Sequence, residues 1–173
     1  MLKKFTPLKT IKRFDDISIE WLKENNKKLV LCDIDNTLVA FDEPNPSEAA
    51  LKFINELQDN NIEIILISNN TEDRVSKFNE NLNLDAYAMA LKPSNKAYRK
   101  IKEKYNHIEL DQMISIGDQL MTDVFGSNLA NIDVILTDQI VEKDLFITKI
   151  NRLFENFIIN RIKKRGNWPD EEM

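Results

Sequence analysis

The chain has 173 residues and a formal net charge of −5, with 42% hydrophobic and 31% charged residues. This size suits one domain, here residues 1–173, and the apolar content excludes a chain that stays disordered for lack of a core. One cysteine and one histidine exclude an internal disulfide and a zinc site built from several such ligands. No apolar run approaches the roughly 20 residues of a membrane-spanning helix, and the N-terminus lacks the apolar stretch of a secretory signal. We therefore expect a cytoplasmic protein.

Basic residues gather at the two ends of the chain. Residues 1–13 carry five basic side chains and no acid, and residues 149–165 carry six basic side chains and one acid. The remainder of the chain is therefore strongly acidic. Such ends either dock on an anionic surface, such as lipid or RNA, or are simply solvated. Charge alone favours solvated ends, and a nucleic-acid partner is not expected.

Short apolar runs alternate with helical patterns along the chain. A helix is predicted around residues 16–25, within a basic N-terminal segment of residues 1–26. Runs rich in Ile, Val and Leu then predict five buried strands. These runs are 28–34, 62–67, 86–89, 113–116 and 132–136. Apolar side chains at helical spacing between the runs predict four helices. They cover 47–60, begin at Thr71 and at Ser94, and cover 121–131.

A long amphipathic helix with a basic end is predicted over residues 142–165. Its apolar positions are Leu145, Phe146, Ile150, Leu153, Phe154, Phe157, Ile158 and Ile162. The helix either packs against the sheet or lies in a membrane interface with its basic end near anionic headgroups. Packing is favoured, and both are compatible if only the basic end touches lipid.

Strands that alternate with helices indicate an α/β fold with right-handed crossovers. We predict a Rossmann-like parallel sheet of five strands, with helices on both faces and extra helices at both termini. Ligands of such a sheet bind at the carboxyl ends of its strands. Polar side chains follow four of the predicted strands at that point. They are Asp33, Asp35 and Thr37; Ser68 and Asn69; Lys92; and Asp118 and Asp123.

Four carboxylates at one edge of a sheet would repel one another strongly without a cation. Oxygen ligands without His or Cys suit a hard cation such as Mg²⁺. We expect Asp33 and Asp118 to bind the ion directly and Asp35 to contribute its backbone carbonyl. Asp123 would act through a water molecule or by orienting the other ligands.

A carboxylate in such a site can attack phosphorus and form an aspartyl-phosphate. Asp33, at the tip of the first strand, is the expected nucleophile. Asp35 lies two residues further on and would protonate the leaving alcohol and then activate water. The other polar groups would bind the phosphoryl oxygens or orient the loop. They are Thr37, Ser68, Asn69 and Lys92.

These residues carry a family resemblance. The segment Asp33–Val39 resembles motif I of the haloacid dehalogenase phosphohydrolases, and Ser68–Asn70 resembles motif II. Lys92–Pro93 resembles motif III and Gly117–Asp123 motif IV. Four motifs in the expected order, each after a predicted strand, are far more specific than one. The resemblance implies a Rossmann-like sheet, Mg²⁺ and a reaction through an aspartyl-phosphate.

The chain also resembles the YqeG-like branch of that family. Phe41–Pro44 and Thr122–Asn128 carry this resemblance, which implies subclass III, without a cap domain, and a relationship to phosphatidylglycerophosphate phosphatases. The intervals from Asp33 to Ser68 and from Ser68 to Lys92 leave no room for a folded cap. An open site fits a bulky substrate, such as a phosphorylated lipid at a membrane surface, or a site that a partner subunit closes.

Several functions stay open at this point. The first is a phosphatase acting on a phosphorylated lipid, with the protein peripheral to the inner face of the membrane. The second is the same chemistry on a soluble metabolite, with a homo-oligomer closing the site. The third is a phospho-acceptor domain similar to response-regulator receivers, and the fourth is an assembly factor without turnover. Asp35 favours turnover, because a receiver needs no acid two residues after its acceptor.

Overall fold

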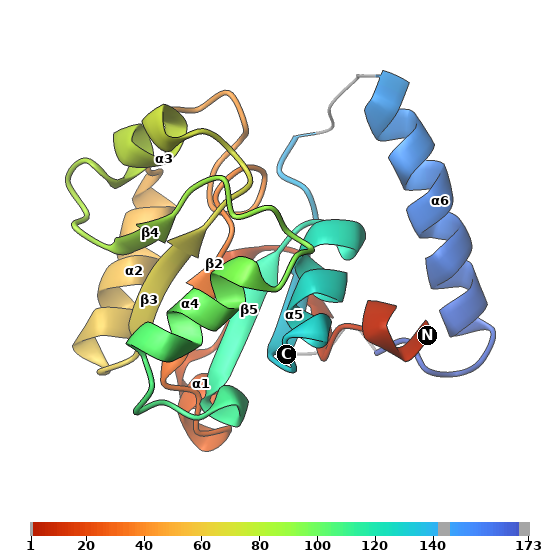
Figure 1. Ribbon diagram of the computed structural model, residues 1–173, viewed down its shortest axis with the longest axis horizontal. Coiled ribbons are helices and arrows are strands. Elements are labelled where there is room, and N and C mark those ends of the chain that lie inside the picture. The colour runs from red at the N-terminus through yellow and green to blue at the C-terminus, as the bar shows by residue number, and fades with distance from the viewer. Residues whose placement is uncertain (1, 142–145, 170–173) are drawn as a thin grey trace.

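The computed structural model describes residues 2–141 and 146–169, with only the backbone described for residues 146–154. Strands and helices alternate along the chain (Figure 1). The strands are β1 (Lys9–Ile11), β2 (Leu29–Cys32), β3 (Glu63–Ile67), β4 (Asp85–Tyr87), β5 (Met113–Gly117) and β6 (Asp133–Thr137). The helices are α1 (Ile19–Glu24), α2 (Glu48–Asp59), α3 (Glu72–Asn79), α4 (Lys96–Lys104), α5 (Phe125–Leu129) and α6 (Phe146–Lys163). Short 3-10 or π turns complete the set: η1 (Leu2–Phe5), η2 (Phe14–Asp16), η3 (Leu110–Gln112) and η4 (Leu120–Val124).

The six strands form one parallel sheet in the order β1-β6-β5-β2-β3-β4. This confirms the predicted Rossmann-like α/β fold. The sheet has one strand more than the five predicted, because β1 pairs with β6 at its edge, with Lys9 opposite Ile135. The three residues of β1 contain one buried apolar side chain, Ile11. Such a short edge strand has no continuous apolar run that would reveal it in the sequence.

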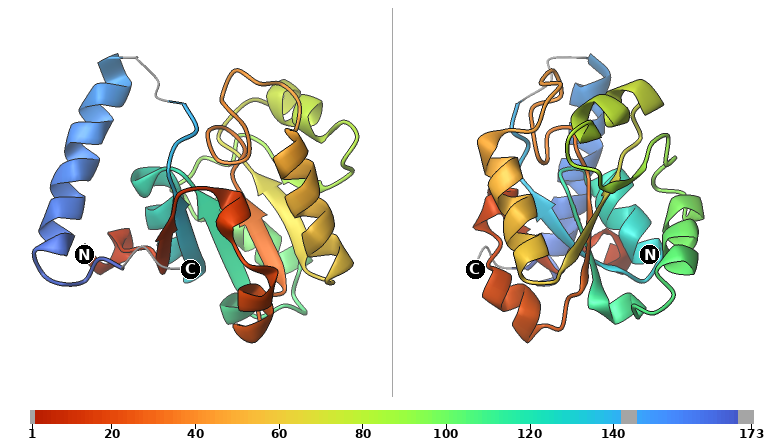
Figure 2. Two further views of the ribbon diagram at one scale, coloured as in Figure 1. Left: turned by 180° about the vertical axis from the view of Figure 1, so that it is seen from behind. Right: turned by 90° about the vertical axis from the view of Figure 1, so that its left-hand side faces the viewer.

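The two faces of the sheet are covered by different helices (Figure 2). Val30 and Cys32 of β2 belong to the core beneath α1, α2 and α3. Leu29 and Leu31 point the other way, into the core beneath α4. Side chains alternate along a strand, so a run of four apolar residues fills two cores at once. The continuous apolar runs of the sequence follow from this two-sided burial.

Two of the predicted helices begin at the capping residues expected from the sequence. Ser47 caps α2 by accepting a hydrogen bond from the backbone of Ala50, and Thr71 caps α3 in the same way. The helix predicted from Ser94 begins two residues later, at Lys96. The helix predicted over 121–131 is divided into the π turn η4 and the short helix α5. These differences leave the carboxyl ends of the strands where the sequence placed them.

The helix α6 stands beside the sheet and runs back along it (Figures 1 and 2). Ile158 and Ile162 pack with Phe5 and Val124 in a third core, and Glu155 accepts a hydrogen bond from the backbone of Met121. The predicted apolar positions from Leu145 to Phe154 lie outside the described side chains. The basic end of α6 lies near η1 and away from the carboxyl ends of the strands (Figure 1). No described helix combines the length and hydropathy needed to cross a bilayer.

Candidate active site

The chain turns sharply after β2 and leaves two aspartates beside the pocket. Asn36 adopts a φ of 65°, and its backbone N–H donates to the carbonyl of Val39 at 2.7 Å. Asparagine tolerates this left-handed conformation better than most residues. Asp33 precedes the turn and Asp35 lies at its start, and both line the same pocket. The Asp-Asn-Thr sequence is therefore the local cause of this geometry.

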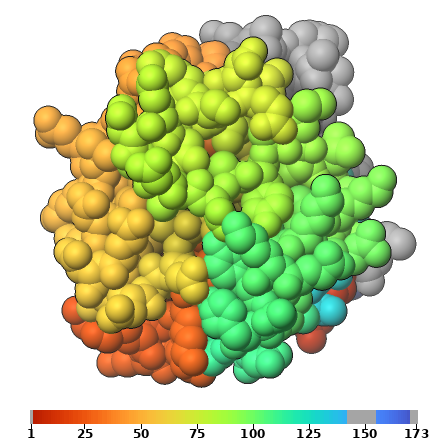
Figure 3. Space-filling view, turned by 60° about the vertical axis from the view of Figure 1, so that its left-hand side comes forward, coloured from red at the N-terminus to blue at the C-terminus, as the bar shows by residue number. Residues whose placement is uncertain are grey.

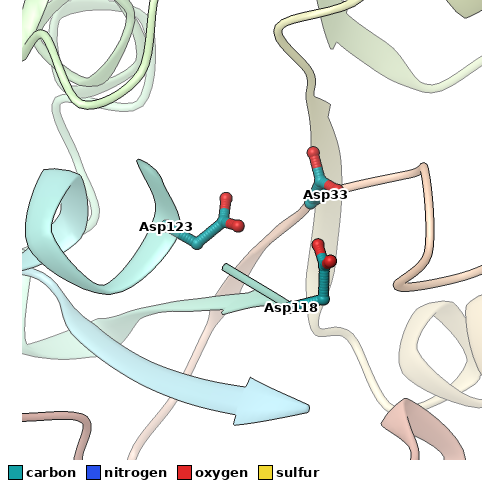
Figure 4. A group of neighbouring side chains, drawn as sticks. All are labelled: Asp33, Asp118 and Asp123. Carbon is teal, nitrogen blue, oxygen red and sulfur yellow. The ribbon is translucent and has the colours of Figure 1, made fainter. Parts of the chain in front are cut away.

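Three carboxylates from two strand ends meet in the interior (Figure 4). Asp33, Asp118 and Asp123 each offer one oxygen atom within 4.8 Å of the others, and all three residues are buried. Gly117 makes room for this cluster, since a Cβ atom there would lie 2.3 Å from Cγ of Asp123. A side chain at position 117 would displace Asp123. Glycine before Asp118 is thus a steric requirement of the cluster.

Lys92 lies between two of these carboxylates. Its Nζ donates to Oδ1 of Asp33 at 2.7 Å and to Oδ1 of Asp123 at 2.6 Å. Asn69, from the loop after β3, holds the Lys92 backbone with two hydrogen bonds, one to the N–H and one to the carbonyl. The residues after β3 and β4 therefore act together to place one ammonium group in the cluster.

The cluster carries more negative than positive charge. Burial raises the pKa of Asp33 to about 6, although Lys92 opposes the shift. Burial and the neighbouring charge of Asp33 also raise the pKa of Asp118 well above its ordinary value. Burial lowers the pKa of Lys92, but Asp123 and Asp33 outweigh this and the pKa is raised, so Lys92 stays charged. Buried oxygen ligands with surplus negative charge fit Mg²⁺, which Asp33 and Asp118 would hold with Asp123 beside them.

Two further residues hold the carboxylates. The Thr37 hydroxyl lies 3.4 Å from oxygens of both Asp33 and Asp118 and can donate to either. Thr37 is buried and does not line the pocket, so in this structure its hydroxyl orients the aspartates. A contact of Thr37 with phosphate stays a prediction. Gln139 donates to Oδ2 of Asp118 at 2.8 Å. Gln139 follows β6, so it too is a polar side chain just after the carboxyl end of a strand, which is a signal that the sequence contains.

Asp35 is held by side chains from the start of α3. Arg74 pairs with its Oδ1 at 2.9 Å, and Asn70 donates to its Oδ2 at 2.9 Å. Arg74 also donates to the carbonyls of Glu43 and Pro44, at 2.8 and 3.2 Å. The guanidinium thus ties the Asp35 carboxylate to the loop after β2. Sequence reasoning missed Arg74, because an arginine in a polar helix is typical of a solvated surface.

These groups surround a polar pocket of about 270 Å³. Its lining consists of Asp33, Asp35, Ser68, Asn69, Asn70, Lys92, Gln119, Thr122 and Asp123. The structure therefore brings together the polar groups from the ends of β2, β3, β4 and β5. Among the described residues, the segments between β2 and β3 and between β3 and β4 each contain one helix and no additional folded unit that could serve as a cap (Figure 1).

Comparison with known proteins gives the family. Residues 30–124 match the model of the haloacid dehalogenase-like hydrolases. The chain is 36% identical over 173 residues to "Probable phosphatase YqeG" of Bacillus subtilis (strain 168), covering 99% of this chain and 100% of that protein. The chain belongs to the haloacid dehalogenase-like hydrolase family. The family predicted from the four motifs is thereby confirmed, and with it an enzyme of the hydrolase class.

Solved structures agree on the fold. The 3-deoxy-D-manno-octulosonate 8-phosphate phosphatase of Yersinia pestis superposes with a TM-score of 0.54 at 15% identity, over 86% of this chain and 89% of that one. The cobalt-bound deoxy-D-mannose-octulosonate 8-phosphate phosphatase (YrbI) of Haemophilus influenzae gives 0.53 at 14% identity, over 80% and 90%. At such identities the likeness concerns the fold alone, and it supports the Rossmann-like sheet described above.

Proposed function

We propose that this protein is a magnesium-dependent phosphomonoester hydrolase that works through an aspartyl-phosphate. The observation that carries the proposal is the position of Asp33 between Lys92 and Asp118 at the wall of a polar pocket. Asp35 lines the same pocket, two residues further along. A buried nucleophile with a second carboxylate beside it is the arrangement that phosphoryl transfer followed by hydrolysis requires.

The reaction takes two steps on these residues. In the first, Asp33 attacks phosphorus, the bond from phosphorus to the alcohol oxygen breaks, and Asp35 gives that oxygen a proton. In the second, Asp35 takes a proton from water, which attacks the phosphoryl group, releases phosphate and restores Asp33. Lys92, Ser68 and Asn69 bind the phosphoryl oxygens. Mg²⁺, when bound, would neutralise charge on those oxygens and on the carboxylates.

For the substrate, we propose phosphatidylglycerophosphate, hydrolysed at the cytoplasmic side of the membrane. The resemblance to the branch related to phosphatidylglycerophosphate phosphatases supports this choice. So does the pocket, which no cap covers among the described residues and which a headgroup at a membrane surface can therefore reach. A soluble phosphorylated metabolite is the second candidate, since the pocket is polar and lacks features that would select an acyl chain.

The test is phosphate release from phosphatidylglycerophosphate in mixed micelles, with Mg²⁺ and with chelator. Sugar phosphates, glycerol 3-phosphate and nucleotides are assayed alongside. We expect Mg²⁺-dependent release that Asp33→Asn reduces on the order of 10⁴-fold or more. Asp59→Asn, an exposed aspartate at the end of α2, is the matched control and should leave the rate unchanged.

The other outcomes separate the alternatives. Release from soluble esters but not from the lipid would contradict the lipid substrate and leave the mechanism in place. Absence of Asp33-dependent release from every ester would contradict the hydrolase. A stable phosphoryl group on Asp33 after incubation with acetyl phosphate would then indicate a phospho-acceptor without turnover.

A further inference from the structure

Seven described residues other than glycine have a positive φ. Five of them are asparagines, which tolerate this conformation: Asn26, Asn36, Asn61, Asn83 and Asn131. The other two are Met89, with a φ of 45°, and Leu91, with a φ of 56°. Large apolar side chains disfavour this backbone region. The chain therefore has asparagine at most of the described positions with this backbone conformation, and departs from that pattern at two positions in one short segment.

Burial does not account for these two residues. Met89 is 59% exposed and Leu91 is 62% exposed. Their side chains thus add little to the core, while their backbones carry strain. Strained residues that packing does not require are concentrated at functional sites, and clustered exposed apolar side chains are typical of surfaces that bind.

The segment is attached to the wall of the pocket. The N–H of Met89 donates to the carbonyl of Asn70 at 2.9 Å, and the N–H of Ala90 donates to the carbonyl of Ser68 at 3.0 Å. Asn70 and Ser68 both line the pocket, and so does Lys92, which follows Leu91 directly. The segment that carries the two exposed apolar side chains therefore borders the candidate active site through its backbone.

Basic side chains follow the segment at once. Lys96, Arg99 and Lys100 are exposed on the first turns of α4, and none has an ion-pair partner among the described residues. Lys96 and Lys100 are four residues apart and thus share one face of the helix. The space-filling view shows α4 adjoining the segment that includes α3 and β4 on one face of the molecule (Figure 3). Apolar side chains next to free cationic groups match the interface of an anionic bilayer.

We propose that Met89 and Leu91, with Lys96, Arg99 and Lys100, form a docking surface for an anionic lipid bilayer. The apolar pair enters the interfacial region and the basic groups lie against the headgroups, so the pocket faces a phosphorylated headgroup in that membrane. This docking surface deepens the proposed function by supplying the source of the substrate. It differs from η1 and the last turns of α6, which lie away from the carboxyl ends of the strands (Figure 1).

The test is binding to sedimented vesicles of phosphatidylglycerol and phosphatidylcholine, compared with phosphatidylcholine alone. We expect binding to the anionic vesicles only. The double variant Met89→Asn/Leu91→Asn should weaken it tenfold or more, and Lys96→Glu/Lys100→Glu should do the same. Asparagine suits the positive φ, so the first variant should unfold at or above the native temperature. Leu51→Asn is the matched control, because Leu51 is 40% exposed on α2, on the other face of the sheet.

Several results would overturn or reassign the proposed docking surface. Native binding by the Met89/Leu91 variant overturns the proposal, as does equal binding to phosphatidylcholine. Loss of binding only in Phe157→Asn, which alters a 63% exposed residue of α6, would assign docking to the basic end of the chain. A lower unfolding temperature in the Met89/Leu91 variant would make the pair structural, and a change in oligomeric state would make it a subunit interface. Vesicle binding without phosphate release would contradict the hydrolase and leave the docking surface standing.

Discussion

Two buried lysines lie at opposite ends of the parallel strands, one at the amino ends and one at the carboxyl ends. Lys27 precedes β2 and Lys92 follows β4, and each is 5% exposed. Lys27 donates to the carbonyl of Asp111 and to the carboxylate of Asp133, both at 2.6 Å. The side chain of Asp133 is 46% exposed. Lys92 instead meets two buried carboxylates, with that of Asp118 close by.

The two buried lysines differ in the balance of charge around them. At Lys27, one ammonium meets one carboxylate and backbone carbonyls, so charge and hydrogen bonds balance within the protein. At Lys92, one ammonium meets a cluster of three carboxylates, and the surplus charge needs a ligand or protons. Burial of a lysine is therefore common to both sites, and the local charge balance is what differs.

Of the two buried lysines, Lys92 should have the larger effect when it is replaced. Lys92→Met keeps most of the side-chain volume but removes the charge that we propose binds the phosphoryl oxygens. We expect kcat/KM for phosphate release to fall about 10²- to 10³-fold. Lys27→Met is the matched control, since it makes the same change at the amino ends of the strands. Equal losses in the two variants would contradict the distinction between them.

The charge surplus should also make the metal-free protein sensitive to pH. The pKa of Asp33 is raised by burial from 3.8 to about 6, so the folded state holds this proton more tightly than the unfolded state. The free energy of unfolding should therefore fall as the pH rises from about 4 to about 6, by on the order of 2 kcal/mol. Urea unfolding with chelator measures this.

Mg²⁺ should restore that stability above pH 6, where Asp33 is ionised, and do so less at pH 5. Asp118, whose pKa is also raised, contributes with the same sign. An equal effect of Mg²⁺ at pH 5 and pH 7.5 would show that the ion binds elsewhere.

Replacement of Lys27 should have the smallest effect. Lys27→Met leaves the carbonyl of Asp111 without this donor, and Asp133 can turn to solvent because its side chain is half exposed. We expect the free energy of unfolding to fall by about 1–3 kcal/mol, with kcat/KM within about twofold of native. Thermal unfolding and phosphate release measure the two quantities. A loss of activity without a loss of stability would give Lys27 a role that its position does not suggest.

The sequence by itself determined the fold class and most of the polar residues around the candidate site. Strand β2 is readable because four consecutive apolar residues fill two cores, and α2 is readable because Ser47 caps an amphipathic helix. Asp33 and Asp118 could be paired in advance, because parallel strands bring their carboxyl ends to one edge. All of these signals are local in the chain, or follow from one general property of parallel sheets.

Only the tertiary structure decided which side chains pair with one another. Lys27 and Asp133 are separated by 106 positions, and Arg74 reaches Asp35 across 39. No local pattern shows that Lys27 is buried against Asp133, or that Leu91 is exposed on a left-handed backbone. Packing of distant elements sets which charges are desolvated together and which apolar side chains stay outside, because burial is a property of the assembled fold.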